Sequence, residues 1–139
     1  MRILIPIMCL IMIVGCKKET DASTTVLSET IDTTAKLVMS GSFQNGPYGA
    51  VSGIGKVYKN YNGTYSILLD SFMTTNGPNL FVYLSKEAMP VNFISAGNLK
   101  STTGSQVYNI TEMPDIAQYK YICIHCKDYN HLFGYALLK

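Results

Sequence analysis

Short hydrophobic runs alternate with turn residues over most of the chain. Gly, Asn and Pro lie between several of these runs. The runs, rich in β-branched, aliphatic and aromatic residues, cover residues 37–43, 51–59, 64–72, 80–85, 106–111, 119–124 and 132–138. Many short strands at near-regular spacing are typical of an all-β sandwich or barrel. We therefore predict a single antiparallel β-sandwich, or a partly open barrel, of about seven to eight strands over residues 37–139, and no helix.

Two segments give more detailed predictions. Asn62 and Gly63 form the clearest turn signal, because an Asn-Gly pair readily takes the positive φ angles of a type I′ hairpin turn. The run 80–85 places aliphatic side chains on one face and aromatic side chains on the other. Since a strand with two apolar faces is covered on both sides, we expect this strand to be central.

The start of the chain has the pattern of an export signal. Arg2 precedes an apolar run over residues 3–14, which Gly15 and Cys16 follow. A helix needs about 20 apolar residues to cross a bilayer, so the run is too short to do so and fits a cleaved signal peptide over residues 1–15. Its last four residues, Ile-Val-Gly-Cys, resemble a bacterial lipoprotein box. The resemblance implies that Cys16 carries lipid and becomes the mature N-terminus.

A lipidated Cys16 would attach the protein to a membrane without spanning it. Lys17 follows the cysteine, and by resemblance to bacterial sorting rules this favours the outer over the inner membrane of a bacterial cell envelope. Residues 16–36 are rich in Thr and Ser and have few aliphatic side chains. Such a stretch buries too little surface to order itself, so we expect a flexible tether between the lipid and the domain.

Composition excludes several classes of function. The chain has 139 residues, of which 14% are charged, and a formal net charge of +2. This length suits one domain, and the balanced charge provides no basic face for nucleic acid. No motif of a classical hydrolase or transferase is present, and no phosphate-binding loop can be found. We therefore expect no classical enzyme activity.

The candidate chemistry lies in two cysteines. Cys9 leaves with the signal and Cys16 takes lipid, so Cys123 and Cys126 remain as thiols. In an extended strand, residues three apart lie on opposite faces and about 10 Å apart at Cα, beyond the roughly 7 Å limit for a disulfide. A bridge becomes possible only if the chain turns at His125. Strand alternation predicts that Cys126 faces the core and that Cys123 shares the other face with His125.

Two histidines lie close to these cysteines in the sequence. His125 and His131 both fall within eight residues of Cys123, so a Cys/His metal site has to be weighed. Alternate strand faces keep these four side chains from converging, so we predict no such metal site. A site that uses Cys126 with one histidine, or an axial thiolate to haem, stays open. A thioredoxin-like motif is excluded, because Cys123 lies in a predicted strand and not at a helix start.

Several motifs follow one another through most of the predicted domain. The most specific is the run from Gly77 to Ser85, which reads Gly-Pro-Asn-Leu-Phe-Val-Tyr-Leu-Ser. Others lie at residues 41–43, 69–72, 97–100, 104–108, 121–126 and 133–136. Together they resemble the DM-thirteen domain family, which is labelled electron-transfer. The family implies a β-sandwich and a redox role for one cysteine, either as a bare thiol or as a ligand to a group such as haem. Cys126 is the matching position; Cys123 has no counterpart, and Asn79 stands where the family often has an acidic residue.

Two hypotheses for the function remain. In the first, Cys126 acts as a thiol or as a ligand to a redox group, with His125 and His131 as neighbours and a redox partner in the envelope. In the second, the domain is a binding or structural module, and Cys126 is a core residue. The second is reasonable because free cysteine is among the most buried residue types.

Overall fold

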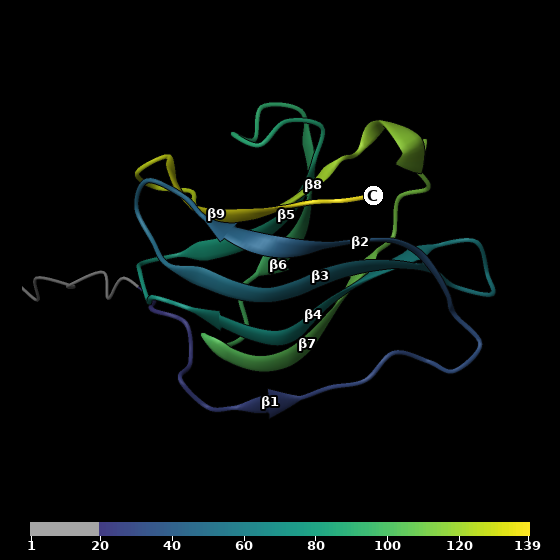
Figure 1. Ribbon diagram of the computed structural model, residues 1–139, viewed down its shortest axis with the longest axis horizontal. Coiled ribbons are helices and arrows are strands. Elements are labelled where there is room, and N and C mark those ends of the chain that lie inside the picture. The colour runs from purple at the N-terminus through teal and green to yellow at the C-terminus, as the bar shows by residue number, and fades with distance from the viewer. Residues whose placement is uncertain (1–19) are drawn as a thin grey trace, which may run out of the picture.

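The computed structural model describes residues 20–139 and consists of one strongly curved β-sheet (Figure 1). The nine strands within these residues follow the order β1-β7-β4-β3-β2-β9-β8-β5-β6, and only the β1–β7 pair is parallel. The strands are β1 (Leu27–Ser28), β2 (Lys36–Asn45), β3 (Val51–Lys59), β4 (Tyr65–Thr74), β5 (Leu80–Ser85), β6 (Phe93–Asn98), β7 (Thr103–Ile110), β8 (Tyr121–Cys126) and β9 (His131–Leu137). The all-β prediction is confirmed as a half-barrel, with slightly more strands than expected.

The sheet folds over at β2. Residues 36–42 of β2 pair with β3, whereas residues 43–45 pair with β9. A Cβ at Gly41 would clash with the carbonyl oxygen of Leu137, so glycine is needed where the end of β9 approaches β2. The two halves of the sheet therefore face each other across one core (Figure 1).

The core follows from strand alternation. Inward side chains of both halves form one cluster, which includes Val57, Ile67, Leu69, Phe72, Val82, Leu84, Tyr108, Ile110, Ile122, Ile124 and Ala136. A second, smaller cluster of Tyr83, Cys123 and Leu132 lies on the other face of β5, β8 and β9.

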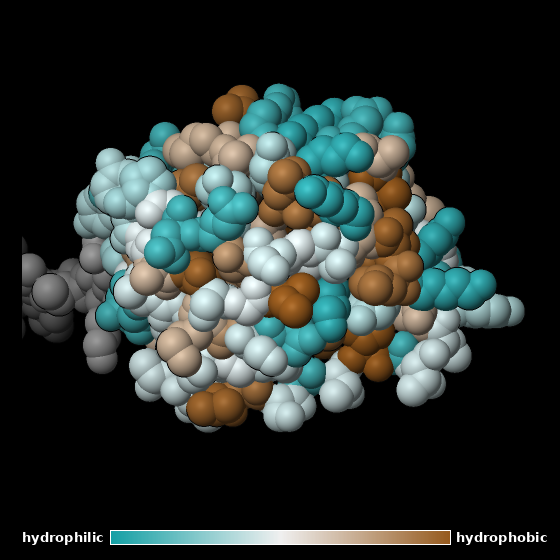
Figure 2. All heavy atoms as spheres, in the orientation of Figure 1, coloured by the Kyte–Doolittle hydropathy of each residue, from teal (hydrophilic) through white to brown (hydrophobic). Residues whose placement is uncertain are grey.

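On the face viewed in Figure 2, apolar side chains are scattered among polar ones and form no single patch. The helical structure within residues 20–139 is limited to the 3-10 helix η1 (Ile116–Gln118), and no helix there is long and apolar enough to cross a membrane.

Two predictions about strands are corrected by the structure. β5 is covered on both faces, as expected, but it is next to the edge strand β6 and not central. The pattern missed β6 because most of its residues are small or polar. It also missed β1, which has two residues. Edge strands are often very short, and a short strand has too few positions for an apolar alternation to be seen.

The predicted hairpin connects β3 and β4, but its turn differs from the expected type. Gly63 has φ +88°, whereas Asn62 is not among the residues with positive φ. A type I′ turn requires positive φ at both central residues, so that prediction is wrong. Instead, the backbone nitrogens of Gly63 and Asn60 donate to the carbonyl oxygens of Asn60 and Thr64, respectively, and form a longer loop that ends at glycine.

Residues 20–29, which we call the strap, lie along β7 where the sequence predicted a flexible tether. Leu27 and Ser28 pair with Gly104 and Ser105 in parallel. The hydroxyl of Ser101 donates to the carbonyl oxygens of Ser23, at 3.0 Å, and Thr25. Hydrogen bonds to β7 and to the loop before it hold the strap in place, although the strap buries little apolar surface. The expectation of a flexible tether therefore fails for the strap.

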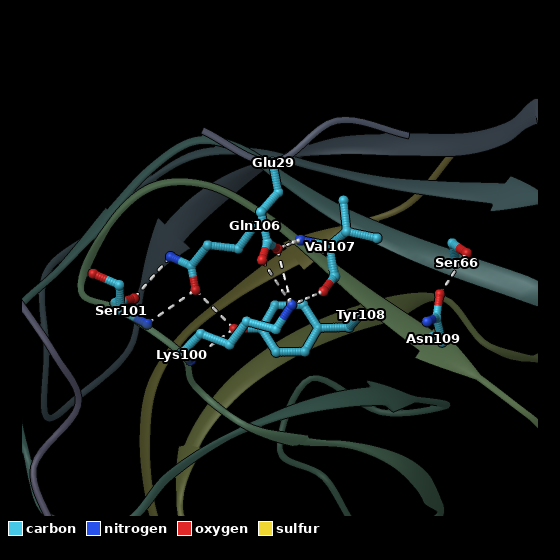
Figure 3. A network of polar contacts seen from close by, with 8 residues as sticks. All are labelled: Glu29, Ser66, Lys100, Ser101, Gln106, Val107, Tyr108 and Asn109. Carbon is cyan, nitrogen blue, oxygen red and sulfur yellow. Dashed lines mark hydrogen bonds and ion pairs between the residues drawn. The ribbon is translucent and has the colours of Figure 1, made fainter. Parts of the chain in front are cut away.

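A polar network fixes the strap to the sheet (Figure 3). Glu29 accepts a hydrogen bond from the backbone nitrogen of Val107 at 2.7 Å and lies 2.9 Å from the Lys100 ammonium. These contacts lower the pKa of Glu29, mainly through the hydrogen bond from Lys100. Beneath this pair, the buried Gln106 accepts hydrogen bonds from the Ser101 backbone nitrogen, at 3.1 Å, and the Tyr108 hydroxyl, at 2.7 Å.

Replacing Gln106 should reveal how much this network contributes. Gln106→Leu leaves the Ser101 backbone nitrogen and carbonyl without their partner and breaks the bond from Tyr108. Because buried polar groups without partners are costly, we expect the free energy of unfolding to fall by about 2 to 4 kcal/mol, as measured by urea denaturation. Asn109→Ala, on the exposed face of the same strand, should cost less than about 1 kcal/mol. Equal losses in the two variants would contradict the role given to Gln106.

Candidate functional site

Cys126 lies at the end of β8, under one loop. The residue is 1% exposed and belongs to the main core cluster. Its Sγ donates a hydrogen bond to the carbonyl oxygen of Pro78 at 3.0 Å. Pro78 belongs to residues 75–79, which connect β4 to β5 and which we call the covering loop. One backbone carbonyl therefore lies directly over the thiol.

The covering loop is held from several sides. Asn79, at φ 51°, donates through Nδ2 to Asp128 at 3.1 Å and accepts from Asn98 at 3.0 Å. A Cβ at Gly77 would clash with the ring of Phe133, so glycine lets the loop lie close to β9. The β5–β6 half of the sheet and the β8–β9 turn together fix the position of the Pro78 carbonyl.

The strap also holds this loop. The backbone nitrogen of Asn79 donates to the carbonyl oxygen of Thr20 at 3.2 Å, and Asp21 forms an isolated β-bridge with Pro78. The side chain of Asn76 donates to the carbonyl oxygen of Ala22 at 3.0 Å. The first described residues thus lie against the loop that covers Cys126.

Cys123 lies on the opposite face of β8, as strand alternation predicted. It packs with Tyr83 and Leu132, and its Sγ lies 3.3 Å from the carbonyl oxygen of Ala88. Burial raises the pKa of this thiol to about 12. Both cysteines are free, and β8 continues straight through His125 to Cys126, which confirms that they do not form a disulfide.

His125 shares the face of Cys123 and is separated from Cys126 by the sheet. Its ring is 5% exposed and lies 5.5 Å from the ring of Tyr83. Nε2 forms a 2.9 Å hydrogen bond with Asn130 Oδ1, while Nδ1 has no hydrogen-bond partner. Burial lowers the pKa of His125, so the neutral ring is favoured. The histidine next to Cys126 in sequence therefore does not contact it.

His131 lies closer to Cys126 in the fold. The two residues are register partners in the β8–β9 pair. The His131 ring stacks on Tyr48, with centroids 3.6 Å apart, and lies 5.9 Å from the ring of Tyr129. The structure therefore brings His131 to the end of the sheet that holds Cys126 and joins it to two tyrosines.

Comparison with known proteins agrees with this fold and with the sequence motifs. The family model described as Electron transfer DM13 matches residues 42–138. The chain belongs to the DM13 family. No curated protein and no solved structure gave a significant match. The matched region contains every strand from β3 to β9 and the last four residues of β2, whereas the strap precedes it.

The surroundings of Cys126 in this DM13 domain do not fit haem. An axial thiolate needs an Sγ that faces a cavity of the size of the macrocycle, but this Sγ is buried in the core and bonded to Pro78. Within residues 20–139, no group of three or more His, Cys, Asp and Glu side chains could hold a metal ion. In the arrangement that the structure describes, the Cys126 sulfur is therefore a buried thiol bonded to the Pro78 carbonyl.

Sequence reasoning missed the part that the covering loop plays. Asn76, Gly77 and Pro78 lie between the runs 64–72 and 80–85, and their composition by itself indicates only a turn. Their contact with Cys126 joins residues 48 positions apart, which no local pattern encodes. The local signal of close packing is Gly77 next to a proline. A side chain at position 77 would clash with the ring of Phe133, so glycine is what allows the loop to lie against β9.

The raised pKa of Cys123 predicts how stability changes with pH. The unfolded thiol ionises near its ordinary pKa of 9, whereas the folded thiol ionises near 12. The unfolded state therefore loses this proton first, and stability falls as the pH rises from about 9 towards 12. Compared with Cys123→Ala, the wild type should lose about 1.4 kcal/mol more between pH 8 and pH 10.

Urea denaturation of both proteins across this pH range measures the difference. Tyr108, whose pKa burial also raises, is present in both proteins, so its contribution cancels. Parallel curves for the wild type and Cys123→Ala would show that the Cys123 thiol is not buried as described.

Proposed function

We propose that this DM13 domain exchanges electrons through the thiol of Cys126. Membership of a family described as electron transfer supports the redox role in general. The observation that carries the choice of residue is the position of Cys126 behind the single covering loop, with its Sγ on the Pro78 carbonyl. Cys123 is a poor alternative, because its pKa of about 12 keeps it protonated at neutral pH.

The chemistry that suits this arrangement is thiol–disulfide exchange with a partner disulfide. Cys126 gives up its proton, and its sulfur attacks one sulfur of the partner. A Cys126–partner disulfide forms, the partner's S–S bond breaks, and the second partner sulfur leaves and takes up the proton. Cys123 cannot resolve the mixed disulfide because it lies on the other face of β8. The thiol that resolves the mixed disulfide must therefore come from a second molecule, because attack by the partner's own released thiol only restores the starting disulfide.

Access to Cys126 requires the covering loop to move. The sulfur is 1% exposed, so reaction in the closed arrangement is blocked. Loops of this kind open locally at much lower cost than the whole fold. The rate of exchange should therefore follow opening of residues 75–79.

The second candidate is a module without redox activity, in which Cys126 only fills the core. Its membership of the main hydrophobic cluster favours this alternative. The two hypotheses predict different results for a serine at position 126. A serine at this position can donate to the Pro78 carbonyl as the thiol does, so Cys126→Ser keeps a partner for its polar group and should remain folded.

The test exposes native protein to oxidised glutathione and locates any adduct by mass spectrometry. The wild type and Cys123→Ser should each gain one glutathione on Cys126. Cys126→Ser should gain none, while its free energy of unfolding falls by less than about 1.5 kcal/mol. A wild type that gains no adduct under native conditions, or gains it on Cys123, would overturn the redox proposal in favour of the module.

We also propose that Cys16 anchors the protein to a membrane of the bacterial cell envelope, the outer membrane being favoured by Lys17. Residues 1–19, which include the predicted signal peptide and Cys16, lie outside the described residues. The support is the sequence alone: an apolar run of signal-peptide length that ends in Ile-Val-Gly-Cys. A redox partner for Cys126 would then be sought in the same envelope.

Replacing the proposed lipidation site tests the anchor. Cys16→Ser should abolish lipid attachment and move the protein from the membrane fraction to the soluble fraction, as followed by fractionation and mass spectrometry. Cys9→Ser is the matched control, because Cys9 lies in the cleaved segment, and it should remain in the membrane fraction. A Cys16→Ser protein that still sediments with membranes after a salt wash would contradict the proposal.

A further inference from the structure

The strap shortens the free connection between the domain and its proposed anchor. Were residues 16–36 a flexible coil, the domain could take any orientation. The structure fixes Ser23, Leu27 and Glu29 to the β6–β7 region through backbone pairing, Ser101 and the Glu29–Lys100 ion pair. Only residues 17–19 then separate Cys16 from Thr20, whose carbonyl is bonded to Asn79.

Chain length limits the distance from the lipid to the covering loop. Four peptide steps join Cys16 to Thr20, and a fully extended chain covers at most about 3.6 Å per residue. The acylated cysteine therefore lies within roughly 14 Å of the carbonyl that Asn79 contacts. This reach is shorter than the strands themselves, since ten residues of β-strand span about 33 Å.

The described chain starts at the same end of the sheet as Cys126. The turns that form this end are residues 46–50, the covering loop and residues 127–130, and we call it the Cys126 end (Figure 1). The hairpin that contains Tyr61 lies at the opposite end (Figure 1). The strap runs parallel to β7, from the Cys126 end towards the hairpin.

We infer that the Cys126 end of the half-barrel rests against the lipid surface in which Cys16 is anchored. This inference depends on the lipid anchor proposed above and adds an orientation to it. The surface of the Cys126 end suits a membrane interface. Tyr48 and Tyr129 are half-exposed there beside His131, and tyrosine is enriched at the level of lipid headgroups. Lys127 and Asp128 balance in charge, so the contact does not depend on anionic lipid.

The orientation restricts the partner of Cys126. A soluble protein would meet the hairpin end first, whereas a partner in the plane of the membrane would meet the covering loop. The electron-exchange partner is therefore a membrane-bound dithiol or disulfide protein. Loop opening would expose the Cys126 sulfur beside the headgroups.

Two matched labels test the orientation in the mature, lipidated protein, which begins at Cys16, reconstituted into phosphatidylcholine vesicles. A fluorophore is attached to Tyr48→Cys at the Cys126 end, or to Tyr61→Cys at the hairpin end; these tyrosines are 55% and 95% exposed. The vesicles contain a lipid with a nitroxide on its headgroup. We expect quenching several-fold stronger at position 48. Cys123 and Cys126 are buried, so brief labelling favours the introduced thiol, and the unsubstituted protein measures the background.

Lengthening the connection supplies the control. A 20-residue Gly/Ser insertion after Glu19 should remove the difference between the two positions while the protein stays on the vesicles. Equal quenching without the insertion, stronger quenching at position 61, or a difference that survives the insertion would each overturn the inference. Protein that fails to bind the vesicles at all would instead refute the lipid anchor, and the glutathione experiment reports on Cys126 independently of both.

Discussion

The alternation of side chains along β8 is the constraint on which the chemistry of this domain depends. Because Cys126 follows Cys123 by three residues in an unbroken strand, the two sulfurs lie in different clusters on opposite faces of the sheet. The pair therefore cannot cycle between a dithiol and an internal disulfide. A redox role based on a thiol would therefore need one cysteine and an external partner.

The same alternation gives the two thiols different environments. Cys123 lies under residues 86–92 on the outer face, and burial raises its pKa to about 12. Cys126 lies on the inner face but at the end of the strand, where one carbonyl covers it. Both thiols therefore lie under a loop, since the carbonyls of Glu87 and Ala88 cover Cys123 as the Pro78 carbonyl covers Cys126. The raised pKa of Cys123, and not burial alone, makes Cys126 the better candidate.

Sequence patterns predicted what depends on local alternation. The all-β class, the two apolar faces of β5 and the separation of the cysteines follow from a period of two, and the structure confirms them. The patterns failed where order comes from polar contacts between distant residues. The strap has few apolar side chains, and what fixes it is Ser101 and Lys100, more than 70 positions away. The contact between the Pro78 carbonyl and Cys126 joins residues 48 positions apart, so local patterns could not predict it either.

The strap has two roles: it pairs with the edge strand β7, and it contacts the covering loop. β7 would otherwise be an edge strand with unpaired backbone groups, which favour association with other chains. Pairing with β1 satisfies part of that edge, and the first residues of the strap then reach the covering loop through Thr20, Asp21 and Ala22. Tension on residue 20 would act directly on Asn79, the neighbour of the carbonyl that holds Cys126. Since the DM13 match begins at residue 42, the proposed redox residue belongs to the family region, while access to it is coupled to a segment that precedes that region.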